Sequence, residues 1–474
     1  MKKLLITTPI YYVNDKPHLG HAYTTLMADI LTRFYKKQNR DVFFLTGTDE
    51  HGTKVFEAAK KQNKEPQEFC DQNSKLFKDL WKNLNIEYTY FIRTTDKRHE
   101  KGVEKFLTKL KENNAVYEKE YKGLYCTGCE KFLTKKELIN GLCPDHKKEP
   151  KEISEKNYFF KLTNYLDQIK KIIETDALKI QPQRAKKETL GLLRQGLEDF
   201  SISRQKVKWG IPLPFDKKQT IYVWTEALLN YITAIGYGDD PDQFKKWWTE
   251  SEKIHLLAKD ILKFHDIYWP AMLLAAEEVI PNKEFVHGFF TVNNEKMSKT
   301  LGNVIDPNNI VKEFGVDSAR YLLLSQFPSD QDGDIKEEQF KEKYNTDLAN
   351  GLGNLVSRVI NLADKNNIKK EKPEKEIEEK TKEAKEKYAN LMENFKLYES
   401  IEETWKLIKF CDSYTDKTKP WEIKEKEKQT KILSNLLYLI SEIAELIQPF
   451  MPQTAEEIKK QLKENKAKPL FPRI

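Results

Sequence analysis

The chain has 474 residues, 39% of them hydrophobic, which is enough for several domains with separate cores. Its longest apolar runs are far shorter than a membrane-spanning helix, so we expect no membrane association. The net charge of +7, from 81 basic and 74 acidic residues, permits a polyanionic partner without requiring one. Five cysteines, an odd number, and the absence of an export signal argue against a disulfide framework and predict a cytoplasmic protein.

The first 52 residues alternate between strand and helix patterns. Residues 3–13 form an apolar run typical of a buried strand, and residues 20–37 have apolar side chains at helical spacing. The segment "DVFFLTGTDEHG" is a second buried strand that ends in small and acidic residues. Strand, helix and strand in this order predict an α/β domain with a parallel sheet.

The turn between the first strand and the helix, "KPHLGHAYT", has features of a phosphate-binding site. Gly20 lets a ligand approach the main chain, and the helix that begins there presents N–H groups and a partial positive charge. His18 and His21 add side-chain donors on either side of the glycine. We therefore predict nucleotide binding at this helix start.

Residues 118–215 are predicted to be an insertion between two halves of the sheet domain. Within it, Cys126-x-x-Cys129 and Cys143-x-x-His146 form two pairs of soft ligands. Such pairs suit one tetrahedral Zn²⁺, and because all four positions are filled the predicted site is structural. Three buried cysteines and a surface histidine are the alternative, which this double spacing disfavours.

A second basic motif, "NNEKMSKTLGN", lies in a polar loop near residue 300. Lys296 and Lys299 flank Ser298, and their two ammonium groups could gather the charge of a departing pyrophosphate. From about residue 341 onward only helical periodicity remains, which predicts a helical bundle. The Lys- and Glu-rich stretch 365–388 within it is typical of a solvated helix or loop.

Several motifs together resemble the methionyl-tRNA synthetase family of class I aminoacyl-tRNA synthetases. They are "TTPIYYVNDKPHLGH", "TGTDEHG", "SRQKVKWGIPLP", "YVWTEALLNY", "AKDILKFHDIYWPAML" and "HGFFTVNNEKMSKTLGN". The resemblance runs from residue 3 to about 460 and is closest to family members with a single zinc knuckle and no C-terminal dimerisation domain.

The resemblance implies a Rossmann-type parallel-sheet catalytic domain, split by the zinc-binding insertion and followed by an α-helical anticodon-binding domain. The expected boundaries are 1–117 and 216–281 for the two catalytic halves, 118–215 for the insertion, 282–340 for a stem-contact region with the lysine loop, and 341–474 for the anticodon-binding bundle.

The resemblance also implies the reaction. Methionine and ATP, with Mg²⁺, would give methionyl-adenylate and pyrophosphate, and the methionyl group would pass to the 3′ end of tRNA(Met), for initiation and elongation. His18, His21, Lys296 and Lys299 are the expected catalytic residues. The expected ATP-binding residues are these four together with Gly20, Arg204, Asp260 and Ser298.

The implied methionine site is largely aromatic and apolar, which suits a soft thioether. One carboxylate, Asp49, stands at a strand end where it can pair with the substrate's ammonium group. The full expected set is Ile10, Tyr12, Asp49, Trp224, Ala227, Leu228, Tyr231, Ile261, Phe264, His265 and Trp269.

The implied tRNA partner carries a CAU anticodon. Asn354, Arg358, Pro420 and Trp421 are the expected anticodon-binding residues, because an indole and a guanidinium suit unstacked bases. The chain ends soon after the bundle, from which we expect a monomer or a separate tRNA-binding subunit acting in trans.

Three positions depart from the family pattern. Ala258 stands where glycine is usual, Thr300 where serine closes the lysine motif, and His146 where some members have cysteine.

Competing interpretations are a synthetase for cysteine or leucine, a small nucleotidyltransferase with the same histidine motif, and an RNA-binding paralogue without catalysis. The aromatic site and the anticodon residues disfavour the first two, and the intact histidines and lysines disfavour the third.

Overall fold

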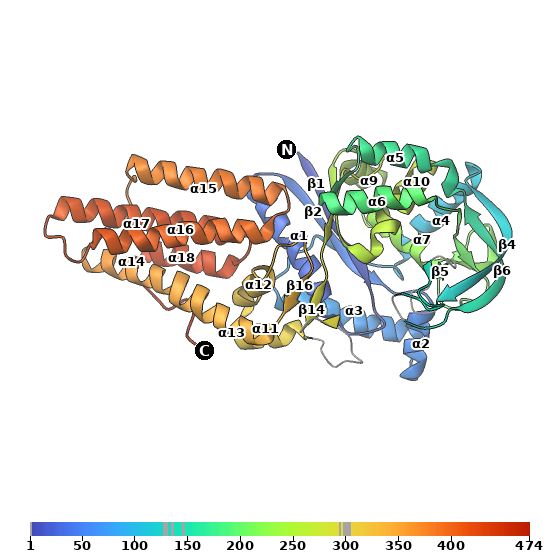
Figure 1. Ribbon diagram of the computed structural model, residues 1–474, viewed down its shortest axis with the longest axis horizontal. Helices are drawn as coiled ribbons and strands as arrows, with labels where there is room; N and C mark the ends of the chain where they lie inside the picture. Colours follow the sequence, from blue (N-terminus) through green and yellow to red (C-terminus); the bar gives the residue numbers. More distant parts are fainter. Residues whose placement is uncertain (1, 127–130, 134–136, 145–146, 293–294, 297–304) are drawn as a thin grey trace. The chain divides into compact units, whose positions relative to one another are not determined.

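The computed structural model describes residues 2–126, 131–133, 137–144, 147–292, 295–296 and 305–474 (Figure 1). The chain divides into two compact units. Unit 1 comprises Met1–Pro17, Asn39–Leu80 and Glu87–Val286. Unit 2 comprises His18–Gln38, Trp81–Ile86 and His287–Ile474.

Within the described residues, unit 1 is built on a six-stranded sheet in the order β3-β2-β1-β12-β13-β7 (Figure 1). These strands are β1 (Lys3–Tyr12), β2 (Asp41–Asp49), β3 (Tyr90–Arg93), β7 (Lys179–Gln181), β12 (Glu252–Ala258) and β13 (Lys283–His287). β1 pairs in parallel with both β2 and β12, which confirms the predicted parallel sheet. Strand order reverses between β1 and β12, and ligands of such sheets bind beyond the carboxyl ends of the strands at this point.

Helices cover the sheet because its strands are buried on both faces, as their near-continuous apolar sequence requires. One core joins Leu5 of β1 and Ile92 of β3 to side chains from several helices of unit 1, including Phe106 and Ile169. The helices of unit 1 include α2 (Thr53–Lys61), α4 (Lys97–Glu112), α5 (Leu166–Glu174), α6 (Gln183–Gln195), α7 (Val223–Leu228), α8 (Asn230–Thr233), α9 (Pro241–Phe244) and α10 (Trp269–Ala275). α3 spans Pro66–Asn83.

Among the described residues, the segment between α4 and α7 forms two small antiparallel sheets. β4 (Val116–Cys126) pairs with β5 (Lys131–Leu133) and, along its whole length, with β6 (Lys151–Phe160), which also pairs with β8 (Phe200–Ser201). β9 (Ser203–Arg204), β10 (Pro212–Leu213) and β11 (Asp216–Ile221) form another sheet. In contrast, β7 adds an edge strand to the parallel sheet.

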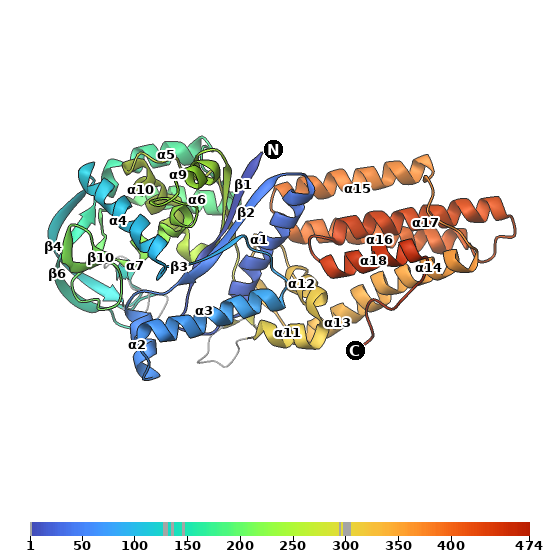
Figure 2. The same cartoon turned by 180° about the vertical axis from the view of Figure 1, so that it is seen from behind.

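Unit 2 contains helix α1 (Leu19–Lys37) together with the C-terminal part of the chain. After β14 (Phe290–Val292) and β15 (Glu295–Lys296) come α11 (Pro307–Phe314), α12 (Val316–Leu324), β16 (Gly333–Ile335) and α13 (Glu337–Lys343). The π-helical η7 (Tyr344–Gly353) continues into α14 (Asn354–Lys365). The long helices α14, α15 (Lys375–Glu393), α16 (Leu397–Thr418), α17 (Lys426–Ile447) and α18 (Pro452–Glu464) lie side by side (Figure 2). This confirms the predicted helical C-terminal part.

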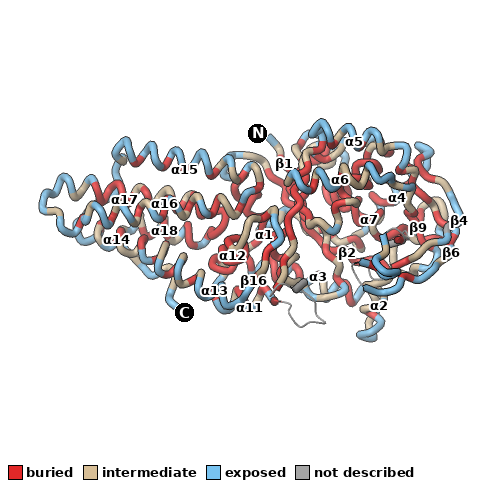
Figure 3. Tube along the Cα trace, in the orientation of Figure 1, coloured by how far each residue is buried: buried red, intermediate tan, exposed pale blue. Residues whose placement is uncertain are grey.

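The Lys- and Glu-rich stretch forms most of α15. Its buried residues Ile377, Ala384, Tyr388 and Met392 recur at helical spacing, and its charged residues face solvent (Figure 3). Among the helices of the described residues, none has both the length and the apolar character needed to cross a membrane.

Close packing in the parallel sheet predicts that Gly47→Ala destabilises the protein. A Cβ at Gly47 of β2 would lie 2.1 Å from the Ile92 carbonyl oxygen of β3. Because the main chain of the sheet cannot move aside without a loss of stability, we expect the free energy of unfolding to fall by about 1–3 kcal/mol, measured by urea denaturation. Gly191→Ala in α6 is the matched control: its Cβ would have no neighbour nearer than 4.0 Å, and helix propensity predicts a gain of up to about 1 kcal/mol. Equal effects of the two substitutions would contradict this account.

Candidate active site

The carboxyl ends of β1 and β2 bring two predicted site residues together. Tyr12 is the register partner of Asp49, and Ile10 is that of Gly47. Asp49 is buried, with only 3% of its surface exposed, and its main-chain oxygen accepts a 3.2 Å hydrogen bond from the Val13 N–H. A carboxylate is thereby held at the edge of the sheet where ligands of this fold bind.

Aromatic rings gather near this edge. The Tyr12 and Trp224 rings meet edge to face with centroids 6.0 Å apart, and Trp224 stacks on Phe264 at 4.2 Å. The same hydrophobic core includes the predicted site residues Ile10, Leu228, Tyr231, Ile261 and Trp269. Ala227, which directly precedes Leu228 on α7, is also buried. The result is an aromatic cluster built from segments that are far apart in the chain.

Two polar side chains of this cluster, Tyr231 and His265, form a hydrogen bond with each other. Tyr231 Oη lies 2.7 Å from His265 Nε2, and His265 Nδ1 lies 3.0 Å from the Ile261 carbonyl oxygen. Because a carbonyl oxygen only accepts, Nδ1 carries the imidazole proton and Nε2 accepts from the Tyr231 hydroxyl. Burial lowers the pKa of His265 to about 4 and raises the pKa of Tyr231 well above its ordinary value. Both side chains are therefore neutral at physiological pH.

A buried carboxylate next to Asp49 was not predicted. Glu50, fully buried, accepts hydrogen bonds from Arg93 Nε at 2.7 Å and Nη2 at 2.9 Å, and from the hydroxyls of Thr48 and Thr95. These donors satisfy both carboxylate oxygens and fix the main chain that follows β2. The available signal was that β3, the next strand of the parallel sheet, ends in Arg93, so that its side chain meets the end of β2.

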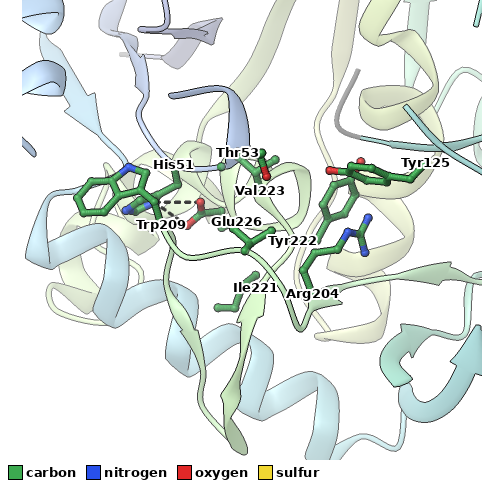
Figure 4. Close-up of a pocket in the computed structure, with 11 residues that line it drawn as sticks. His51, Thr53, Tyr125, Arg204, Trp209, Ile221, Tyr222, Val223 and Glu226 are labelled. Carbon is green, nitrogen blue, oxygen red and sulfur yellow. Dashed lines mark hydrogen bonds and ion pairs between the residues drawn. The ribbon is translucent and has the colours of Figure 1, made fainter. Parts of the chain in front are cut away.

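Unit 1 also contains a small pocket that opens to solvent (Figure 4). His51, Trp209 and Glu226 gather on one side of it, and Tyr125, Arg204 and Tyr222 on the other. α7 supplies Glu226 to this pocket and Trp224 to the aromatic cluster. Except for Arg204, these lining residues were not predicted.

His51 and Glu226 form a buried ion pair in that pocket. His51 Nδ1 lies 2.9 Å from Glu226 Oε1. Burial lowers the pKa of His51, but the Glu226 carboxylate outweighs it and raises that pKa above its ordinary value. Burial also raises the pKa of the Glu226 carboxyl above its ordinary value. The Trp209 indole contacts the His51 ring and donates a 2.6 Å hydrogen bond to the Glu50 carbonyl, which links this pair to the end of β2.

Arg204 faces the pocket as a buried cation. Its guanidinium lies 4.0 Å from the centre of the Tyr222 ring and donates 2.8 Å hydrogen bonds to Ser201 Oγ and the Ser203 carbonyl. Stacking and hydrogen bonding hold its plane in one orientation. Such a cation can attract an anionic ligand that enters the pocket.

In unit 2, His18 and His21 form the N-terminal cap of α1. His18 Nδ1 accepts the Gly20 N–H at 3.1 Å, His21 Nδ1 accepts the His18 N–H at 3.2 Å, and the two rings stack with centroids 3.7 Å apart. Because each Nδ1 accepts a hydrogen bond, the ring N–H lies on Nε2. Burial, and secondarily the neighbouring His18, lowers the pKa of His21 well below its ordinary value. The helix start therefore carries two side-chain N–H donors.

The structure shows a further reason for glycine at position 20, beside the predicted approach of a ligand to the main chain. A Cβ there would lie 3.0 Å from His18 Cε1, so the glycine makes room for the His18 ring that folds back as the cap.

Asp260 lies just beyond the carboxyl end of β12 and is exposed. Ala258 has an extended backbone (φ −90°), which does not require glycine.

Part of the predicted site lies outside the described residues, namely Ser298 and Lys299 of the lysine loop and Cys129 and His146 of the metal site. Of Lys296 only the main chain is described, in β15. Cys126 and Cys143 are buried together in one small cluster with Leu133. The Lys147 N–H donates to the Cys143 carbonyl at 2.8 Å, so the chain turns tightly after Cys143.

The predicted anticodon-binding residues lie in the helical part of unit 2. Asn354 begins α14 and is exposed, and Trp421, after the end of α16, has 48% of its surface exposed. Pro420 is buried, and its carbonyl accepts a hydrogen bond from Gln429. The Arg358 guanidinium bonds to Asp412 and, at 3.1 Å, to Asp416, so α16 holds it in place.

Comparison with known proteins gives concordant matches. The family model described as "tRNA synthetases class I (M)" matches residues 4–360, and the model "Anticodon-binding domain of tRNA ligase" matches residues 374–471. The chain is similar to the methionine–tRNA ligase of Thermotoga maritima, with 43% identity over 96% of this chain and 74% of that protein. It is equally similar to that of Clostridium acetobutylicum, with 43% identity over 97% and 73%.

Among solved structures, the chain resembles Mycobacterium tuberculosis methionyl-tRNA synthetase in complex with methionyl-adenylate. The TM-score is 0.92 and the identity is 33%, over 97% of this chain and 93% of that one.

The neutral state of His265 predicts a pH dependence of stability. Its folded-state pKa of about 4 lies below the ordinary 6.5, so the unfolded chain binds a proton that the folded chain rejects. The stabilisation is complete above pH 6.5 and is lost as the pH falls toward 4, by about 2 kcal/mol at about pH 5 for this histidine alone. We expect His265→Gln to reduce the slope of unfolding free energy against pH in this window, measured by urea denaturation. An unchanged slope would mean that the pKa of His265 is the same in the folded and unfolded chain, which would contradict this account.

Proposed function

The chain belongs to the methionyl-tRNA synthetase family of class I, and on this premise we propose that it is a methionine–tRNA ligase. It activates methionine with ATP to give methionyl-adenylate and pyrophosphate, then transfers the methionyl group to the 3′ end of tRNA(Met). It thereby serves both initiation and elongation of protein synthesis. Matches to a methionine-type catalytic model and to an anticodon-binding model on one chain disfavour a small nucleotidyltransferase and a synthetase for cysteine or leucine.

The aromatic cluster of unit 1, with its neutral Tyr231–His265 pair, is the observation that supports this function most. The Trp224–Phe264 stack offers polarisable faces to a thioether. A charged pair in the same place would favour a charged substrate side chain. Asp49, at the strand edge, pairs with the substrate's ammonium group. The remaining predicted residues, Ile10, Tyr12, Ala227, Leu228, Ile261 and Trp269, complete the walls.

Catalysis consists of positioning the reactants and stabilising charge. The His18 and His21 Nε2–H groups and the start of α1 bind phosphate oxygens, while Lys296 and Lys299 stabilise the departing pyrophosphate. Arg204, Asp260 and Ser298 complete the ATP site. The family uses ATP with Mg²⁺, which supplies further neutralisation of phosphate charge when it is bound.

A structural zinc ion is part of the proposal. Cys126, Cys129, Cys143 and His146 are its ligands, and the burial of Cys126 beside Cys143 above a tight turn fits a zinc knuckle. Of the described residues, Leu133 and Leu138 are the apolar neighbours of these cysteines, so the metal would supply stability that this small core lacks.

Recognition of tRNA completes the function. Trp421 is exposed and Asn354 and Arg358 lie one helical turn apart on α14, an arrangement that suits stacking and hydrogen bonding with the bases of a CAU anticodon. Whether the chain acts as a monomer or with a tRNA-binding subunit in trans stays a prediction, which analytical ultracentrifugation of the purified chain tests.

Methionine-dependent exchange between pyrophosphate and ATP tests the proposed activity. We expect exchange with methionine and, in Lys299→Ala, a loss of about 100-fold or more in kcat, because the transition state loses one charged donor. Lys312→Ala, on the exposed face of α11, is the matched control and retains full exchange.

Trp421→Ala separates the two halves of the reaction. It retains exchange and loses about 5- to 150-fold in kcat/KM for tRNA charging, the value of one stacked base. Exchange with another amino acid only, or with none, would contradict the proposed function.

Metal analysis tests the zinc proposal. We expect one zinc per chain, lost in Cys126→Ala and Cys143→Ala together with stability toward proteolysis between residues 116 and 160. Cys411→Ala, which removes a buried cysteine of α16, is the control and keeps the metal. Zinc retained at full stoichiometry in both knuckle variants would contradict these ligands.

A further inference from the structure

The guanidinium of Arg320, on α12, is completely buried in unit 2 and all five of its N–H groups have acceptors. Nη2 donates to Asp29 Oδ2 at 2.7 Å and to the Pro449 carbonyl at 2.9 Å, and Nε donates to the Phe450 carbonyl at 2.8 Å. Nη1 donates to the carbonyls of Leu84 and Asn85 at 3.0 and 3.2 Å. One side chain therefore joins three segments of unit 2 that are distant in sequence.

The first of these segments is α1, the helix whose N-terminus carries His18 and His21. Asp29 is fully buried in the middle of α1, and its Oδ2 also accepts from Arg33 Nε at 2.8 Å, one turn further on. Arg33 in turn donates to the Asn85 carbonyl at 2.8 Å. Asp29 lies eight residues, or about 12 Å along the helix, from His21. A shift or rotation of α1 would break these bonds.

The second segment is the turn between α17 and α18 of the helical bundle, which contains Pro449 and Phe450. α12 holds this turn at two points, because Asp317, one helical turn before Arg320, accepts the Thr454 N–H in the first turn of α18 at 2.6 Å. A displacement of α17 and α18 therefore acts on α12 and, through Arg320, on Asp29.

The energetic argument rests on burial. A charged pair with complete hydrogen bonding is strong in a low-dielectric interior, and breaking one partner away leaves an uncompensated charge at a cost of several kcal/mol. Any arrangement in which the Arg320 hydrogen bonds are partly broken is consequently high in free energy. The three segments therefore move together or not at all. Lysine cannot replace it, since a single ammonium has three donors and no planar fork.

We propose that Arg320 is a positioning residue that couples RNA binding by the helical bundle to phosphate binding at the start of α1, acting through Asp29. This inference rests on the proposed function, which assigns the anticodon to the bundle and ATP to His18 and His21. RNA bound to the bundle selects one arrangement of α17 and α18, and Arg320 transmits it to the two histidines. By linkage, ATP strengthens RNA binding by the same factor.

The test measures kcat/KM for ATP in methionine-dependent pyrophosphate exchange, with and without a saturating CAU anticodon stem-loop as a separate RNA. For the unmodified chain we expect the RNA to change this value by about 5-fold or more. In Arg320→Lys the ratio approaches one. If that variant does not fold, the double variant Asp29→Leu/Arg320→Met replaces the buried charges with apolar groups and serves the same purpose.

Leu436→Ala, in the bundle core, is the control for simple destabilisation. It lowers Tm but keeps the ratio of the unmodified chain. If Arg320 were merely structural, the Arg320 variants would behave in the same way. A ratio of one in the unmodified chain, a ratio retained in the Arg320 variants, or a ratio lost equally in Leu436→Ala would each overturn the coupling. No exchange at all in the unmodified chain would instead overturn the proposed function on which it rests.

Discussion

The hydrogen bond between Tyr231 and His265 sets the character of the proposed amino-acid site, because it places two polar side chains in an aromatic core without placing a charge there. The Ile261 carbonyl fixes the histidine proton on Nδ1, and the tyrosine hydroxyl satisfies Nε2. Trp224 and Phe264 can then line a site for a substrate side chain that is itself uncharged and polarisable. The specificity proposed here depends on this neutrality more than on the size of any one side chain.

Fully satisfied buried charges perform the complementary task of holding main chain in place. Glu50 uses both oxygens to fix the end of β2 beside Asp49, and Arg320 uses all five donors to fix α1 within unit 2. In both cases the charge is costly to bury and is retained where several main-chain segments must keep one geometry. The Glu50–Arg93 pair belongs to unit 1 and the Arg320 set to unit 2, so each compact unit has its own fixed point.

Much of the fold was predictable because its signals are local. The strand, helix and strand at the N-terminus follow from apolar periodicity, and the bundle from its 3.6-residue repeat. Tyr12, Asp49, Trp224 and Phe264 were named through family resemblance, and the structure brings them together at one edge of the sheet or in one cluster. The zinc spacing is equally local, although two of its ligands lie outside the described residues.

The contacts that sequence reasoning missed join residues that are far apart. Glu50 meets Arg93, His51 meets Glu226, and Asp29 meets Arg320, and no periodicity or spacing pairs such partners. Gly20 shows a subtler limit: the residue was identified for ligand approach, but the room that it leaves for the folded-back His18 ring depends on a side-chain conformation. The most direct test of the central claim is a crystal structure of the chain with methionine bound. The account predicts the methylthio group among Trp224, Phe264 and Tyr231 with the ammonium at Asp49, whereas methionine bound instead in the pocket between His51 and Arg204 would contradict it.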